Sequence, residues 1–231
     1  MKLILTCEHG GNEIPTKYAD YFDKHQAILK THRGFDLGAL DYFKHLKPLA
    51  DFSSFSKISR LLIELNRSLH HKNLFSEFSK ELPLSAKKEL IAEHYLPYRN
   101  SIENEISKHI HKKELVIHLS IHSFTPVLNA VERNCDIGLL FDSRIAQEKQ
   151  VASFLKETIL SKTTDFKVRY NYPYLGKMDG FTTYLRKHFP KNYVGIEIEI
   201  NQKYAEDNNN KKVLKNILFD AISTLKTNKF L

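Results

Sequence analysis

The residues best suited to chemistry lie where apolar runs end. His9 follows the run 3–5 and is followed at once by two glycines, and His122 lies in "VIHLSIHS". Two histidines and a carboxylate around one point form the usual catalytic zinc site, which leaves a fourth position for water. Zinc lowers the pKa of that water toward about 7 and polarises a carbonyl group. We therefore predict that His9 and His122 are ligands of a zinc ion.

Gly10 and Gly11 fit this interpretation, because residues without a side chain let the chain turn sharply and leave space beside a ligand. The alternative is a strand-to-helix turn with an incidental histidine, since "HGG" alone is a weak motif. For the third ligand the residues leave two candidates. Asp36 opens an amphipathic segment, where an acid is also common as a capping group. Glu13, four residues after His9, is its rival.

The dipeptide Asn66-Arg67 follows the apolar run 60–65. A guanidinium group offers two parallel donors that match a carboxylate, so Arg67 is a candidate for binding a substrate anion. Arg60 and Arg186 are further candidates. A surface position is the alternative for Arg67 and Arg186.

Glu197 and Glu199 lie in the apolar run 194–200, and their spacing of two puts them on one face of a strand. An acid in such a strand is costly unless it is paired or useful. One of them is therefore a candidate general base, and the other could orient a histidine or a lysine. Glu64 could likewise support a metal ligand.

These residues need a scaffold, and the pattern of the chain predicts one. Strands are expected at 2–7, 60–65, 114–123, 136–142, 166–171 and 194–200, with 50–56 as one more. Helices are expected at 36–47, 85–110 with a kink at Pro97, 143–160, 180–189 and 210–226. Strands alternating with helices indicate a mostly parallel central sheet with helices on both faces. We expect a single three-layer α/β domain over residues 1–231, with a ligand site beyond the carboxyl ends of the strands.

Composition limits the other possibilities. The 231 residues carry a net charge of +8, but the lysines are scattered and form no patch interleaved with aromatic residues, so we do not expect nucleic-acid binding. No apolar stretch approaches the ~20 residues needed to cross a bilayer, and there is no signal-peptide pattern, so we expect no membrane association. Two cysteines make no disulfide framework, and a cytoplasmic location is expected.

The chain resembles the N-formylglutamate amidohydrolase family. The resemblance rests on "CEHGGNEIP", "HRGFDLGAL", "SRLLIELNRS", "LSIHS", "NYPYLGKMDGFTTYLR" and "GIEIEINQ", which occur in the family's order between residues 7 and 202. It implies a zinc-dependent amide hydrolase on a phosphorylase/hydrolase-like fold. That fold is shared with zinc carboxypeptidases and with cell-wall N-acetylmuramoyl-alanine amidases.

The resemblance also implies roles for single residues. The metal ligands of the cell-wall amidases map onto His9, Asp36 and His122. The carboxypeptidase pattern has a glutamate three residues after the first histidine, where this chain has Asn12, so that version of the motif is broken.

In the carboxypeptidases an Asn-Arg dipeptide grips the substrate carboxylate, as Asn66-Arg67 would here. The family pattern of an acid followed three residues later by glutamine puts the catalytic carboxylate at Glu199, with Gln202 completing the match.

The expected function is zinc-dependent hydrolysis of a linear amide in a small anionic N-acyl amino acid, with N-formyl-L-glutamate as the candidate substrate. The alternatives are a peptidoglycan or peptide amidase, a carboxypeptidase-like hydrolase, and a catalytically silent binding protein of the same fold. The sequence leaves the acyl group and the oligomeric state open.

Overall fold

A mixed, mostly parallel sheet runs through the centre of the computed structural model, which describes residues 1–205 and 208–227. Its six strands lie in the order β2-β1-β3-β8-β6-β7. Their bounds are β1 Lys2–Cys7, β2 Phe52–Phe55, β3 Val116–Phe124, β6 Ile137–Leu140, β7 Val168–Tyr170 and β8 Tyr193–Asn201. The strands β2, β1, β3 and β8 are parallel, while β6 pairs antiparallel with β8. The predicted α/β fold class is therefore confirmed.

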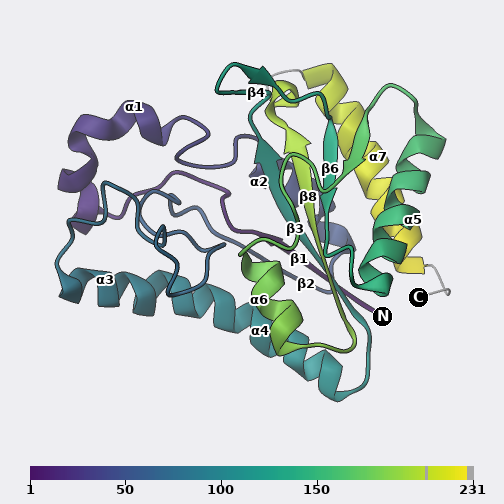
Figure 1. Cartoon of the computed structure of the whole chain (residues 1–231), viewed down its shortest axis with the longest axis horizontal. Helices are drawn as coiled ribbons and strands as arrows, with labels where there is room; N and C mark the ends of the chain where they lie inside the picture. The colour runs from purple at the N-terminus through teal and green to yellow at the C-terminus, as the bar shows by residue number, and fades with distance from the viewer. Residues whose placement is uncertain (206–207, 228–231) are drawn as a thin grey trace.

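Helices cover both faces of this sheet (Figure 1). On one face, α2 (Ala39–Leu46), α5 (Ala146–Lys162) and α7 (Asn208–Thr227) pack on the apolar side chains of the strands. On the other face lie α4 (Leu96–His111) and α6 (Phe181–His188), together with buried residues of the N-terminal 3₁₀ helix. The remaining elements are short: the 3₁₀ helices Thr16–His25, Lys47–Leu49 and Gln202–Tyr204, the helices α1 (Gln26–Leu29) and α3 (Leu84–Leu90), and the hairpin of β4 (Val127–Leu128) and β5 (Val131–Glu132).

Alternation along β3 and β8 separates the core from the site. Ile117, Leu119 and Ile121 of β3 face the core shared with α5 and α7. Because side chains in a strand alternate between faces, the polar residues at the positions between them lie on the opposite face. The parallel register pairs His122 with Glu199, so their side chains share that face.

One predicted strand is wrong. Residues 60–65 form buried turns, in which the amide of Leu62 donates to the carbonyl of Ser59 and that of Glu64 to the carbonyl of Leu74. The segment is apolar because Leu62, Ile63 and Leu65 are fully buried against α4 and its neighbours. A short apolar run predicts that a segment is buried, but a buried segment can be a strand or an irregular turn.

Two helix predictions are refined by the structure. The segment 85–110 is α3, a π-helical turn at Ile91–Tyr95, and α4. The π turn ends two residues before Pro97, whose nitrogen cannot donate within a helix. The other change is that α2 begins at Ala39, after Gly38 with φ of +82°, so Asp36 lies in the loop before the helix and does not cap it.

Candidate functional site

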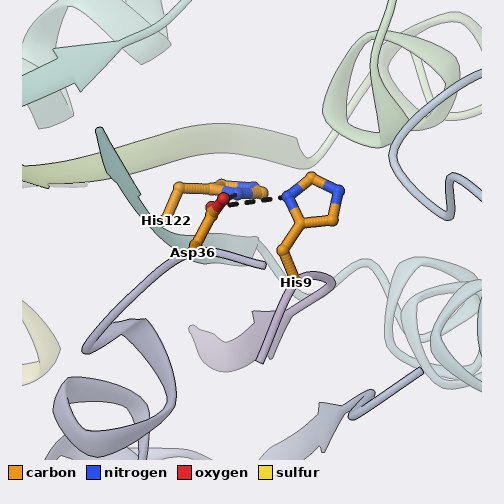
Figure 2. Close-up of side chains that lie close together, drawn as sticks. All are labelled: His9, Asp36 and His122. Carbon is orange, nitrogen blue, oxygen red and sulfur yellow. Dashed lines mark hydrogen bonds and ion pairs between the residues drawn. The ribbon is translucent and has the colours of Figure 1, made fainter. Parts of the chain in front are cut away.

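His9, Asp36 and His122 converge at the carboxyl ends of β1 and β3 (Figure 2). Asp36 Oδ2 lies 2.9 Å from His122 Nδ1 and 3.4 Å from His9 Nδ1. All three residues are buried, and each offers a ligand atom within 4.8 Å of the other two. This His–Asp–His group could hold a metal ion, and its donor set is the one that zinc takes in catalytic sites.

A carboxylate lies behind each histidine ring. His9 Nε2 contacts Glu64 Oε1, and His122 Nε2 lies 3.2 Å from Glu8 Oε2. Glu8 also accepts hydrogen bonds from the hydroxyl groups of Tyr98 and Ser120. A carboxylate on the second ring nitrogen fixes the orientation of a metal-binding histidine and raises its basicity. The structure thus turns both Nδ1 atoms toward Asp36.

The charges of this group support one another. Burial and Arg60 lower the pKa of His9, but Glu64 and Asp36 outweigh them and raise it. Burial raises the pKa of Asp36, but His9, His122 and Arg60 more than compensate and hold it well below its usual range. The buried carboxylate of Asp36 therefore stays ionised, as a metal ligand must.

Glu13, the rival third ligand, lies elsewhere. Its backbone bridges to Ile58, and its half-exposed carboxylate pairs with Lys57 at 3.1 Å.

The structure gives a reason for Gly10 and Gly11 that differs from the expected one. A Cβ on Gly10 would lie 2.8 Å from the carbonyl oxygen of Ser56, and one on Gly11 would lie 2.7 Å from that of Lys57. The close approach of this backbone requires glycine, rather than space for metal and substrate.

Glu199 lies next to this group on the neighbouring strand. It is buried, and its Oε2 has no hydrogen-bond partner among the described residues. Burial raises its pKa to about 8; His122 and Arg60 act against this shift, and Asp36 and Glu197 add to it. Glu197, one pleat back, accepts a hydrogen bond of 2.6 Å from the hydroxyl group of Thr182.

A cavity of about 230 Å³ opens over these residues. The cavity is lined by the His–Asp–His group with Glu197 and Glu199, and also by Arg60, Asn66, Arg67, Ser123, Tyr174, Leu175, Met178 and Asp179. Asn66 and Arg67, the predicted substrate-binding residues that follow the apolar run 60–65, therefore line the cavity, although that run is not a strand.

The three arginines differ in what they can offer a ligand. Arg67 donates to the backbone carbonyl of Asp179 and has no carboxylate partner among the described residues. Arg60 lies between two acids, with its Nε 2.9 Å from Glu64 Oε2 and its Nη1 3.2 Å from Asp36 Oδ1. Arg186 does not line the cavity. It is buried, and its donors are taken by Glu148, the hydroxyl of Thr183 and the carbonyls of Gly176 and Gly195.

The N-formylglutamate amidohydrolase family model matches residues 1–205. The chain belongs to this family. The resemblance seen in the sequence is thereby confirmed. No curated protein matches the chain.

Two solved structures support the fold of this family member. The gene product Atu2144 of Agrobacterium tumefaciens has a TM-score of 0.76 and 24% identity, over 97% of this chain and 92% of that one. The N-formylglutamate amidohydrolase of Ralstonia eutropha JMP134 has a TM-score of 0.75 and 14% identity, over 98% of this chain and 93% of that one. A metallo-carboxypeptidase from Burkholderia cenocepacia aligns with a TM-score of 0.38 and 11% identity, over 97% of this chain and 56% of that one.

Several residues at the family member's site have no role that follows from the sequence pattern. Glu8 follows β1 directly, and an acid at the end of a buried strand is a signal that it supports a neighbouring ligand. Tyr174, Leu175 and Met178 line the cavity from a segment with no regular structure, and periodicity gives no signal for such residues.

Among the described residues, the structure has no helix with the length and apolarity that a membrane span requires.

Proposed function

We propose that the protein is a zinc-dependent hydrolase of a linear amide in a small N-acyl amino acid, with N-formyl-L-glutamate as the first candidate. The observation that carries this proposal is the buried His–Asp–His group beside Glu199, a carboxyl group with a free oxygen. The family membership supports the same reaction class.

His9, Asp36 and His122 would hold the metal. Their fit is supported by the donor set, by the convergence of both Nδ1 atoms on one Asp36 oxygen, and by the carboxylates Glu8 and Glu64 behind the rings. Zinc, when bound, supplies a Lewis acid that polarises a carbonyl and lowers the pKa of water.

Glu199 would move the proton in this reaction. The raised pKa of Glu199 means that its carboxylate holds a proton strongly. With the positive charge of a metal at the His–Asp–His group favouring its ionised form, this carboxylate can take a proton from the attacking water. The same carboxylic acid can then protonate the nitrogen of the leaving amine. Burial keeps bulk water away from this exchange, and the free Oε2 is available to the substrate side.

Asn66 and Arg67 would bind the carboxylate of the amino-acid half. Asn66 is fixed by the amide of Phe181, which donates to its Oδ1 at 2.7 Å. The guanidinium of Arg67 lines the cavity without an acid partner among the described residues, so it can accept a substrate carboxylate as its counter-charge. Arg60, held between Glu64 and Asp36, is a further candidate for contact with a substrate oxygen.

The test combines metal content with turnover. Purified protein should contain one zinc per chain and hydrolyse N-formyl-L-glutamate in a panel of N-acyl amino acids. Glu199→Gln keeps the shape but removes the base, so kcat should fall by roughly 10²–10⁴ while zinc stays bound. Glu197→Gln, on the same strand face, is the matched control and should lose much less.

Two results would contradict the proposal. Full activity in Glu199→Gln would remove the assigned base. If the two variants exchanged their effects, Glu197 and not Glu199 would be the base.

A further inference from the structure

A second cavity, also of about 230 Å³, adjoins the first. The two cavities share Asp36, Arg60, Ser123 and Tyr174, which therefore lie between them. The second cavity is bounded on its far side by His32, Arg33, Phe124, Thr125, Leu128 and Gln202. Leu128 belongs to the β4–β5 hairpin, which stands beyond the carboxyl end of β3 (Figure 1).

The lining of this second cavity is positively charged. Asp36 is the sole carboxylate among its described lining residues, and both histidines and Arg60 already surround that group. Arg33 and Arg60 are the cationic residues in the lining. Arg33 shares its charge with Glu77, and Arg60 shares its charge with Glu64.

Arg133 adds a cation with no such partner. It is only 9% exposed, and its guanidinium donates to the carbonyl of Thr125 and to the hydroxyl of Tyr174, two lining residues. In the part of the chain that the structure describes, no carboxylate lies within ion-pair distance of it. Burying a cation without a counter-charge is costly, so a bound anion would relieve this cost.

The pKa of His32 is lowered by the same arginines. Partial burial lowers its pKa, and Arg133, Arg33 and Arg60 lower it further, against the weaker opposing effect of Asp36. Three guanidinium groups thus act on one residue of the second cavity's lining.

The position of the cavity indicates which part of a substrate would enter it. This step rests on the proposed function, in which Arg67 holds the amino-acid half in the first cavity. Because Asp36 and Ser123 line both cavities, a substituent on an amide carbonyl held at the His–Asp–His group can extend past Asp36 into the second cavity. A formyl group has only a hydrogen atom there and would leave about 230 Å³ unused.

We propose that the second cavity binds an acyl chain that ends in a carboxylate, so that the substrate class is an amino acid acylated by a dicarboxylic acid. Hydrolysis breaks the C–N bond, adds the oxygen of water to the acyl carbon, and passes a proton to the nitrogen. The products are a free dicarboxylate and a free amino acid.

The experiment compares three substrates of the zinc-loaded enzyme: N-succinyl-, N-succinamoyl- and N-formyl-L-glutamate. The succinyl and succinamoyl compounds differ only in a terminal carboxylate or amide. A charge-assisted hydrogen bond predicts that the succinyl compound has a kcat/KM about tenfold to a hundredfold higher than the succinamoyl compound. Equal values for these two compounds would overturn the proposal.

Variants assign the preference to this cavity. Arg133→Gln should reduce the succinyl-to-succinamoyl ratio by at least about fivefold. Arg33→Gln provides a second test in a side chain that is 42% exposed and therefore safe to change. Arg144→Gln, which removes the same charge from a side chain that is 76% exposed, is the matched control and should leave the ratio unchanged. A ratio that is no lower in Arg133→Gln and Arg33→Gln than in the control would also overturn the proposal.

A binding measurement separates this inference from the hydrolase function. Calorimetric titration of the zinc-loaded Glu199→Gln variant with the succinyl and succinamoyl compounds measures affinity without turnover. If the wild type hydrolyses none of the compounds, the hydrolase proposal fails, and titration of the wild type still decides the cavity's preference. Tighter binding of the succinyl compound supports the second cavity as a carboxylate site, and equal affinity refutes it.

Discussion

The buried ion pair of Glu148 and Arg186 gives the sharpest prediction for stability. Glu148 Oε1 accepts from Arg186 Nε at 2.6 Å and from the amide of Gly195 at 3.0 Å, and its Oε2 accepts from the amide of Asp142 at 2.7 Å. Glutamine has one acceptor oxygen, so Glu148→Gln must turn its own N–H groups toward at least one of these donors. The change also leaves Arg186 buried without its counter-charge.

The expected cost follows from both effects. Breaking a buried pair by removing one partner costs about 3–5 kcal/mol, which includes a buried donor left unsatisfied at about 1–3 kcal/mol. Glu148→Gln should therefore lower the free energy of unfolding by about 3–5 kcal/mol, a large part of the ~5–15 kcal/mol of a typical domain. Because the chain has no tryptophan, circular dichroism is the suitable probe of urea unfolding.

The matched control is Glu157→Gln, at an exposed position of the same helix, α5. Its effect should stay within about 0.5 kcal/mol. A loss below about 1 kcal/mol in Glu148→Gln would refute the view that this pair holds α5, α6 and β8 together. The pair also matters for the site, because Arg186 donates to the carbonyl of Gly176, next to the cavity-lining Leu175. We therefore expect KM to rise in the variant.

Three further predictions concern the site. His9→Ala and His122→Ala should each lose most of the bound zinc, measured by metal analysis after dialysis, and full occupancy in both would exclude the proposed centre. Arg67→Ala should lower kcat/KM for carboxylate substrates by an amount equal to about 1.5–3 kcal/mol but should change little for uncharged amides, and equal losses on both would exclude a role in reading charge. The third prediction is a pH dependence in the metal-free protein. Burial raises the pKa of Glu199 from 4.5 to about 8, so its protonation favours folding below pH 4.5, and this contribution is lost as the pH rises to about 8. The unfolding free energy of Glu199→Gln relative to wild type should thus increase over this range by up to about 5 kcal/mol, and a flat difference in urea titrations would contradict it.

The sequence predicted which residues come together where regular strands position them. In "VIHLSIHS", strict alternation separates the core residues from His118, Ser120 and His122, so the face of His122 follows from the pattern alone. The end of an apolar strand likewise predicted the position of His9. Both features are local and need no knowledge of the sheet order.

Other features depend on contacts that a linear pattern does not contain. The choice between Asp36 and Glu13 depends on which loop folds back on β3, and the amide of Asp36 is held by the carbonyl of His9. The antiparallel direction of β6 depends on its neighbour in the sheet. Residues 60–65 read as a strand because burial, and not pleating, determines their composition.

The last helix shows that recognisable sequence similarity ends before the folding unit does. The family model stops at residue 205, yet α7 places Leu214, Leu218, Ile222 and Leu225 in the core, each at most 1% exposed. At about 1.5–3 kcal/mol for each buried side chain, these four are worth about 6–12 kcal/mol, comparable with the whole stability of a typical domain. A chain shortened at residue 205 would keep every residue of the proposed site but would expose the apolar surfaces of α2 and α5. We expect such a truncated protein to aggregate, so expression trials of related chains need the helix that the similarity leaves out.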